Sequence, residues 1–159
     1  RLAQVAAIDR DALPVQNEIV QVNDVVRSVL PLARAAAERR GARTVTDLEP
    51  GLPRVVADRA RLAEALTLFA TDAAATAGPT VPLMIAKERA GPRAIIRIAP
   101  VSPVAKSSAQ TERATVSNTE NQPSLPGTAA LLFASRLVAA QGGEVAVDRD
   151  GLILRVGRK

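Results

Sequence analysis

The chain has 159 residues, 47% of them hydrophobic, a net charge of +5, and neither histidine nor cysteine. The missing cysteines exclude disulfides and thiol catalysis, and fit a reducing compartment. The missing histidines exclude acid–base catalysis by imidazole and the serine or cysteine triads that depend on it. The hydrophobic content can form one substantial core, so we expect a single domain with an N-terminal helical stub. No apolar run is long enough to span a membrane, so we expect this domain to be soluble. Because the chain begins at Arg1 rather than Met, we also expect it to be a piece of a longer protein.

The positive charge raises the question of a nucleic-acid or membrane-surface partner, because cations bind phosphate without sequence preference. The basic residues are scattered, however, and cluster only at Arg39, Arg40 and Arg43 and at Arg59 and Arg61. Single-strand recognition also needs exposed aromatic rings. The chain has two Phe, both on faces predicted to be buried. We therefore interpret the basic residues as solvated helix surface and expect no specific nucleic-acid partner.

The first predicted elements are a helix and a strand. Apolar residues recur at helical spacing after Asn23 and Asp24, and Gly41 ends the run. The members of this run are Val25, Val26, Val29, Leu32, Ala33 and Ala36. Residues 42–48 then form a predicted strand, and the Gly and Pro residues within 49–53 predict a turn.

Residues 58–77 predict an amphipathic helix. Its buried stripe is formed by Leu62, Leu66, Phe69 and Ala73. Asp58 is the expected N-cap, and Gly78 followed by Pro79 ends the helix. Leu68 and Asp72 lie four residues apart, so they share one edge of the stripe and can face a cleft beside the helix.

The remaining sequence predicts two hairpins and another helix. Residues 81–87 and 93–99 alternate as strands do, and Gly91 and Pro92 form the turn between them. Residues 127–141 predict a helix that ends at Gly142 and Gly143. Residues 144–147 and 152–156 predict a closing hairpin with Asp-Gly in its turn. The intervening residues 104–126 are rich in polar residues and Pro, and predict a loop.

The predicted helix over 58–77 resembles the N-box helix of the ATP-binding domain of bacterial sensor histidine kinases, whose frame is D-x-x-R-L-x-Q-x-L-x-N-L-x-x-N-A-x-K. Residues at the framework positions are Asp58, Arg61, Leu62, Leu66, Phe69 and Ala73. The order of the other elements also matches over nearly the whole chain. The resemblance implies a two-layer α/β sandwich of the Bergerat (GHKL-type HATPase) fold, with a mixed sheet packed on about three helices. It also implies that residues 1–20 are the end of a dimerisation-hairpin helix and a linker, that 21–159 are the ATPase-like domain, and that 104–126 are the ATP lid.

The residues at the family's nucleotide-binding positions differ from the usual ones. In the N-box, Asp72 stands where an Asn holds Mg²⁺, Leu68 where an acidic or amide residue is usual, and Ala75 where a phosphate-facing Lys is common. The second box, D-x-G-x-G, places its Asp on the adenine. Alternation through Ile96 and Ile98 aligns that Asp with Pro100.

The glycine positions are also depleted. The second-box glycines align with Ser102 and Val104, whose side chains occupy space that the nucleotide would need. The third box, G-x-G-L-G-L, wraps phosphate at a helix N-terminus. It begins here with Gly127 and Thr128 and keeps one glycine of three.

Three functions remain open. The first is a degenerate histidine-kinase-type ATPase domain of a two-component phosphorelay, with no catalytic residue and no bound cofactor. Such a domain would contact a response regulator or other signalling protein and form a homodimer through an upstream helical hairpin. The second is an active domain that binds ATP and Mg²⁺, with Asp72 as the metal ligand, and phosphorylates a histidine outside this chain. The third is a basic nucleic-acid or membrane-surface module. Under the first two, we expect a cytoplasmic domain, which can be free or the cytosolic part of a membrane-bound sensor.

Overall fold

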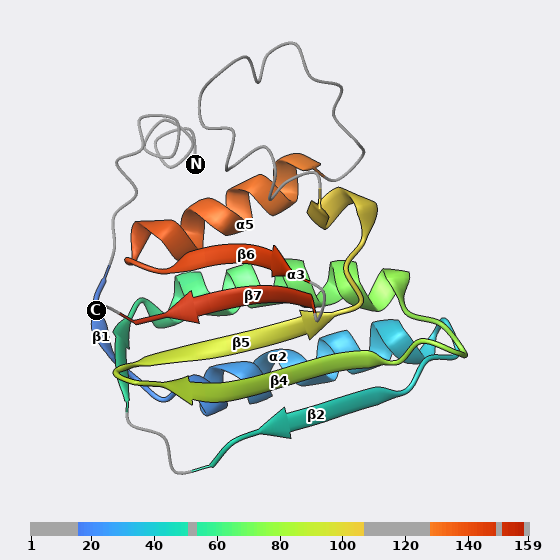
Figure 1. Cartoon of the computed structure of the whole chain (residues 1–159), viewed down its shortest axis with the longest axis horizontal. Coiled ribbons are helices and arrows are strands. Elements are labelled where there is room, and N and C mark those ends of the chain that lie inside the picture. Colours follow the sequence, from blue (N-terminus) through green and yellow to red (C-terminus); the bar gives the residue numbers. More distant parts are fainter. Residues whose placement is uncertain (1–15, 51–53, 107–127, 149–150, 158–159) are drawn as a thin grey trace.

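The computed structural model describes residues 16–50, 54–106, 128–148 and 151–157 (Figure 1). The helices are α2 (Val22–Glu38), α3 (Arg59–Thr76) and α5 (Thr128–Ala140), and residues 103–106 form a further helical turn. The strands are β1 (Glu18–Val20), β2 (Thr44–Leu48), β3 (Val55–Ala57), β4 (Leu83–Ala90), β5 (Arg93–Ala99), β6 (Glu144–Asp148) and β7 (Gly151–Val156). No helix in the described ranges is long and apolar enough to cross a membrane.

The main sheet has five strands in the order β2-β4-β5-β7-β6. The β2–β4 pair is parallel and the other pairs are antiparallel, so the sheet is mixed. Helices α2, α3 and α5 lie on one side of this sheet, with α3 in contact with both of the others (Figure 1). This is the two-layer α/β sandwich with three helices that the sequence predicts.

A single hydrophobic core lies between the two layers. Alternate residues of the central strand β5 face it, with Ile96 fully buried and Ile98 1% exposed. The helical contribution includes Leu62 and Phe69 of α3, which are 0% and 3% exposed. The buried stripe predicted for α3 is therefore confirmed, and α3 is the central helix of the layer.

The boundaries of α2 and β4 differ from the prediction. Helix α2 begins at Val22, so Asn23 and Asp24 lie in its first turn instead of preceding it. Its buried stripe runs through Val22, Val25, Val26, Val29, Leu30, Ala33 and Ala37. Leu32 was expected in the core but is 50% exposed, because it projects away from that stripe. Strand β4 begins at Leu83, and Val81 is 44% exposed in the preceding turn.

A second, two-stranded sheet was not predicted. Strand β1 pairs antiparallel with β3, with Ile19 opposite Val56. Val20 and Ala57 are fully buried, so this ribbon closes one end of the core. Each strand has three residues, too few for a period-2 pattern to be recognised.

Several predicted features fall outside the described residues. These are residues 1–15 of the expected hairpin helix and linker, most of the expected lid over 104–126, and Gly127 of the third box. Of the lid, the structure describes residues 104–106, which belong to the helical turn after β5.

Candidate functional site

The N-terminus of α3 is fixed by a buried hydrogen-bond network around Asp58. The Arg61 N–H donates to Asp58 Oδ1 at 3.1 Å, which confirms the predicted N-cap. The Gln16 N–H donates to the other carboxylate oxygen at 2.9 Å. The Asp58 N–H in turn donates to Gln141 Oε1 at 2.8 Å, and Gln141 Nε2 donates to the Leu137 carbonyl. Helix α3 is thereby held against the end of α5 and the start of the described chain.

This network positions the edge of α3 that the sequence assigned to a nucleotide. Leu68 is half-buried and packs against the core, so an apolar side chain occupies the first of the two edge positions. Asp72 follows one turn later and is half-buried. Ala75 is exposed and has no group that could contact a phosphate.

Asp72 is bound by Ser102, which the sequence analysis assigned to the second nucleotide box. Ser102 Oγ donates a hydrogen bond to Asp72 Oδ2 at 2.6 Å. The same hydroxyl accepts the Ala105 N–H at 2.9 Å and so caps the helical turn over 103–106. Ser102 is 5% exposed. The structure thus brings together two of the predicted site residues, and both are satisfied within the chain.

The end of β5 follows the alternation on which the second-box alignment depends. Ile96 and Ile98 face the core, and Pro100 comes directly after the strand. Pro100 and Val104 are half-buried, and Val104 packs against the core. Of the third box, Thr128 is the first residue of α5.

Burial changes the acidity of Asp72. Desolvation raises the pKa of its carboxyl above the ordinary value, and the hydrogen bond from Ser102 partly offsets that rise. Within the described ranges, no group of three or more acidic side chains is arranged to hold a metal ion. The site contains one carboxylate and one hydroxyl in direct contact, those of Asp72 and Ser102.

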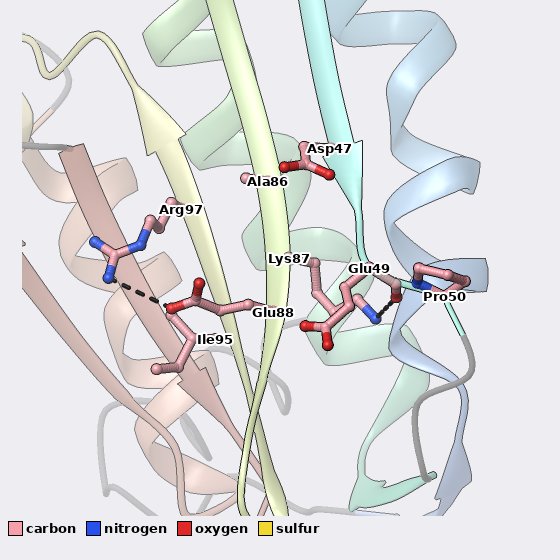
Figure 2. Close-up of a pocket in the computed structure, with 8 residues that line it drawn as sticks. All are labelled: Asp47, Glu49, Pro50, Ala86, Lys87, Glu88, Ile95 and Arg97. Atoms are coloured by element: carbon pink, nitrogen blue, oxygen red, sulfur yellow. Dashed lines mark hydrogen bonds and ion pairs between the residues drawn. The ribbon is translucent and has the colours of Figure 1, made fainter.

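A second feature lies on the opposite side of the sheet, where sequence reasoning placed no site. A pocket of about 310 Å³ lies at the β2 edge of the main sheet, on the face that no described helix covers (Figure 2). It is lined by Asp47, Glu49, Pro50, Ala86, Lys87, Glu88, Ile95 and Arg97. Strand alternation could have indicated that Asp47 and Glu49 share a face, but not that Glu88 and Arg97 of two other strands lie beside them.

Lys87 is buried next to this pocket. Its side chain is 2% exposed, and Nζ donates to the Glu49 carbonyl at 2.5 Å (Figure 2). Burial lowers the pKa of the Lys87 ammonium, Glu49 opposes that change, and Arg27 adds to it. Asn23 Nδ2 donates to the same carbonyl at 3.2 Å, so Lys87 and Asn23 tie the end of β2 to β4 and α2.

No model of a known protein family matches the sequence, and no curated protein sequence matches it. Solved structures match it over almost its whole length. The histidine kinase AdeS of Acinetobacter baumannii has a TM-score of 0.68 at 16% identity, over 99% of this chain and 75% of AdeS. The nucleotide-free catalytic domain of the histidine kinase ThkA has a TM-score of 0.67 at 16% identity, over 90% of this chain and 96% of that domain. This chain has the fold of a histidine-kinase catalytic domain.

Longer kinase structures contain the same fold. Full-length ShkA, crystallised with AMPPNP, has a TM-score of 0.69 at 21% identity over 98% of this chain, which spans 34% of ShkA. Helix α3 is the element that the sequence resemblance assigned to the N-box. Asp72 on that helix faces Ser102, the residue aligned with a second-box glycine.

Proposed function

We propose that this chain is a histidine-kinase-type ATPase-like domain of a two-component signalling protein, that it binds little or no ATP, and that it acts through protein contacts. Its partner is a response regulator or another signalling protein, and an upstream helical hairpin makes it a homodimer. The domain works on the cytoplasmic side. The observation that carries this proposal is the Asp72–Ser102 hydrogen bond within a histidine-kinase catalytic fold.

The Asp72–Ser102 contact supports loss of the nucleotide site. At 2.6 Å the Ser102 hydroxyl occupies one carboxylate oxygen of the residue aligned with the Mg²⁺ ligand. Mg²⁺ requires a near-octahedral set of oxygen ligands, and releasing Asp72 for it would cost this charge-assisted hydrogen bond. Ser102 is also the cap of the turn over 103–106, so moving it would leave the Ala105 N–H unpaired.

The neighbouring positions support the same conclusion. Pro100 has no carboxylate for the adenine amino group, Ala75 has no charge for a phosphate, and Leu68 faces the core. Losing one such contact costs about 1–3 kcal/mol. Micromolar ATP binding corresponds to only about 8 kcal/mol. These residues therefore do not fit Mg-ATP.

Two alternatives make different predictions. An active kinase domain would use the half-buried Asp72 carboxylate as its metal ligand. A nucleic-acid module would need exposed aromatic rings for stacking, but Phe69 is 3% exposed and Phe133 packs against the core. The active kinase is therefore the stronger alternative.

Thermal melting with and without millimolar Mg-ATP tests the proposal. Because the chain has no Trp or Tyr, circular dichroism is the suitable signal. We expect the midpoint to be the same with Mg-ATP as with MgCl₂ alone. A ligand at ~1,000 times its Kd would add roughly 4 kcal/mol and shift a domain of this size by roughly 8–16 °C.

A shift of that size that disappears in Asp72→Ala would establish the active kinase and overturn the proposal. A salt-sensitive shift with DNA in place of Mg-ATP would favour the nucleic-acid module.

A further inference from the structure

Strand β2 forms a free edge of the main sheet. It pairs with β4 on one side and, within the described chain, with no strand on the other (Figure 1). The Leu83 N–H donates to the Arg43 carbonyl and the Glu49 N–H donates to the Lys87 carbonyl, so the odd-numbered residues of β2 bond to β4. The backbone groups of Thr44, Thr46 and Leu48 therefore face the free edge, where another strand could pair with them.

Beside this edge, the sheet face that no described helix covers is acidic. Asp47 is exposed on β2, and Glu88 is exposed on β4, the next strand. Glu49 Oε2 accepts the Arg89 N–H at 2.8 Å. Together with Arg97, these carboxylates line the 310 Å³ pocket (Figure 2). Three carboxylates at one edge contrast with the net charge of +5 of the chain.

The pocket lining also includes two cations, and both are engaged: Lys87 Nζ donates to the Glu49 carbonyl. Arg97 Nη2 contacts Glu88 at 3.5 Å, and its Nη1 contacts Asp148 on β6 at 3.5 Å. The Arg97 guanidinium therefore lies between the carboxylates of Glu88 on β4 and Asp148 on β6. The pocket keeps an excess of negative charge at its β2 side, where Asp47 and Glu49 lie.

Apolar side chains continue the same face in the other direction along β2. Val45 lies opposite Met84 in the β2–β4 register, and the two are 40% and 46% exposed. Residues two apart on a strand point to the same side and lie ~7 Å apart. Val45, Asp47 and Glu49 thus form one row along the edge, apolar at its start and acidic at its end.

We propose that the β2 edge binds an extended basic segment of a partner protein, which adds to the sheet as a further strand. Its backbone pairs with Thr44, Thr46 and Leu48, an apolar side chain packs on Val45 and Met84, and a Lys or Arg two residues away enters the pocket beside Asp47. Charge complementarity selects a basic segment over an acidic one. This inference rests on the proposal that the domain acts through protein contacts, but it does not depend on whether ATP binds.

Short peptides test this surface on the full 159-residue chain. The probe is fluorescein-labelled Val-Thr-Arg-Thr-Arg-Thr, compared with Val-Thr-Glu-Thr-Glu-Thr and with Val-Thr-Arg-Pro-Arg-Thr, whose proline interrupts strand pairing. Anisotropy titrations give the Kd values, and amide chemical shifts of the ¹⁵N-labelled chain locate the site. We expect the basic peptide to bind about tenfold more tightly than either comparison peptide and to shift the amides of β2.

A matched pair of variants separates local from general electrostatics. Asp47→Lys reverses a charge on β2, and Glu64→Lys makes the same change at an exposed site on α3 in the helix layer. Asp47→Lys should weaken binding of the basic peptide by about tenfold, whereas Glu64→Lys should change it by less than about twofold. Equal melting temperatures of the two variants confirm that both are folded.

Other results would overturn the inference. Absence of binding by the basic peptide, equal affinity for the basic and acidic peptides, or shifts confined to the helix layer would each contradict it. If Glu64→Lys weakens binding of the basic peptide as much as Asp47→Lys does, the binding depends only on the net charge of the chain, and the inference is wrong. Undiminished binding of the proline peptide would contradict strand addition. If the basic peptide does not bind and Mg-ATP does not shift the melting midpoint, the inference about the β2 edge is wrong. The proposal that the domain binds little or no ATP then still stands, because melting with Mg-ATP does not probe β2.

Discussion

Asp72 illustrates how a carboxylate at a predicted ligand position can be satisfied within the chain. The sequence placed it on the cleft-facing edge of the helix, and the structure has it half-buried there. Its contact with Ser102 satisfies the carboxylate within the chain. The cost of this arrangement is a carboxylate that is partly removed from water, which is why its pKa is raised.

The raised pKa of Asp72 predicts a pH-dependent contribution to stability. Because the folded-state pKa lies above the ordinary value of 3.8, the folded chain holds the proton more tightly than the unfolded chain. The stabilising contribution is therefore complete below pH 3.8 and is lost as the pH rises through the folded-state pKa. Asp72→Asn removes this titration and keeps an oxygen acceptor for Ser102.

Urea unfolding of both proteins measures this effect. The measurements are made at several pH values between about 3.5 and 7, which includes the range in which carboxylates titrate. The stability of the native chain should fall relative to that of Asp72→Asn as the pH rises. A native chain that gains stability relative to Asp72→Asn with rising pH would contradict the raised pKa.

At the scale of the element, the junction between α5 and β6 depends on two adjacent glycines with different roles. Gly142 has φ +84°, a backbone conformation that residues with a side chain rarely adopt. The Gly143 N–H donates to the Val138 carbonyl at 3.0 Å, which closes the helix end. A Cβ on Gly143 would lie 2.6 Å from the Arg155 carbonyl oxygen, so β7 passes directly against this residue.

Gly143→Ala should therefore destabilise the domain by about 1–3 kcal/mol through overpacking against backbone. Gly78→Ala is the matched control, because a Cβ there meets nothing within 4 Å and its φ is not positive. This control should be neutral or stabilise by about 0.4–1 kcal/mol, since it restricts the unfolded chain. Chemical denaturation of both variants measures the difference, and equal effects would contradict the close packing at Gly143.

At the scale of the whole molecule, one hydrophobic core joins the helix layer, the main sheet and the β1–β3 ribbon. Val20 of β1, Leu66 of α3 and Leu154 of β7 all belong to one cluster of buried residues. The Asp58 network adds buried hydrogen bonds between Gln16, α3 and α5. We therefore expect all the described elements to unfold together.

Calorimetry tests this expectation. The ratio of calorimetric to van't Hoff enthalpy should be about 1, and circular dichroism should give the same midpoint. Deleting residues 1–20 should lower that midpoint, because it removes β1 and its buried Val20. Two separate transitions, or an unchanged midpoint after the deletion, would contradict a core shared with β1.

Most of the fold could be predicted because its signals are local. The stripe from Leu62 to Phe69 repeats with the helical period, and the alternation through Ile96 and Ile98 has the period of a strand. The candidate site could be predicted less completely. Asp72 and Ser102 were each assigned to a nucleotide box, but their direct contact joins residues 30 apart in sequence.

Patterns of neighbouring residues account for the helices, the longer strands and the Asp58 cap. They do not account for β1 and β3, for Gln141 as the partner of Asp58 across 83 residues, or for an acidic pocket built from β2, β4 and β5. The difference has a physical origin. Backbone propensity and hydrophobic period act within one element, whereas these contacts form only after packing of the two layers has brought distant segments together.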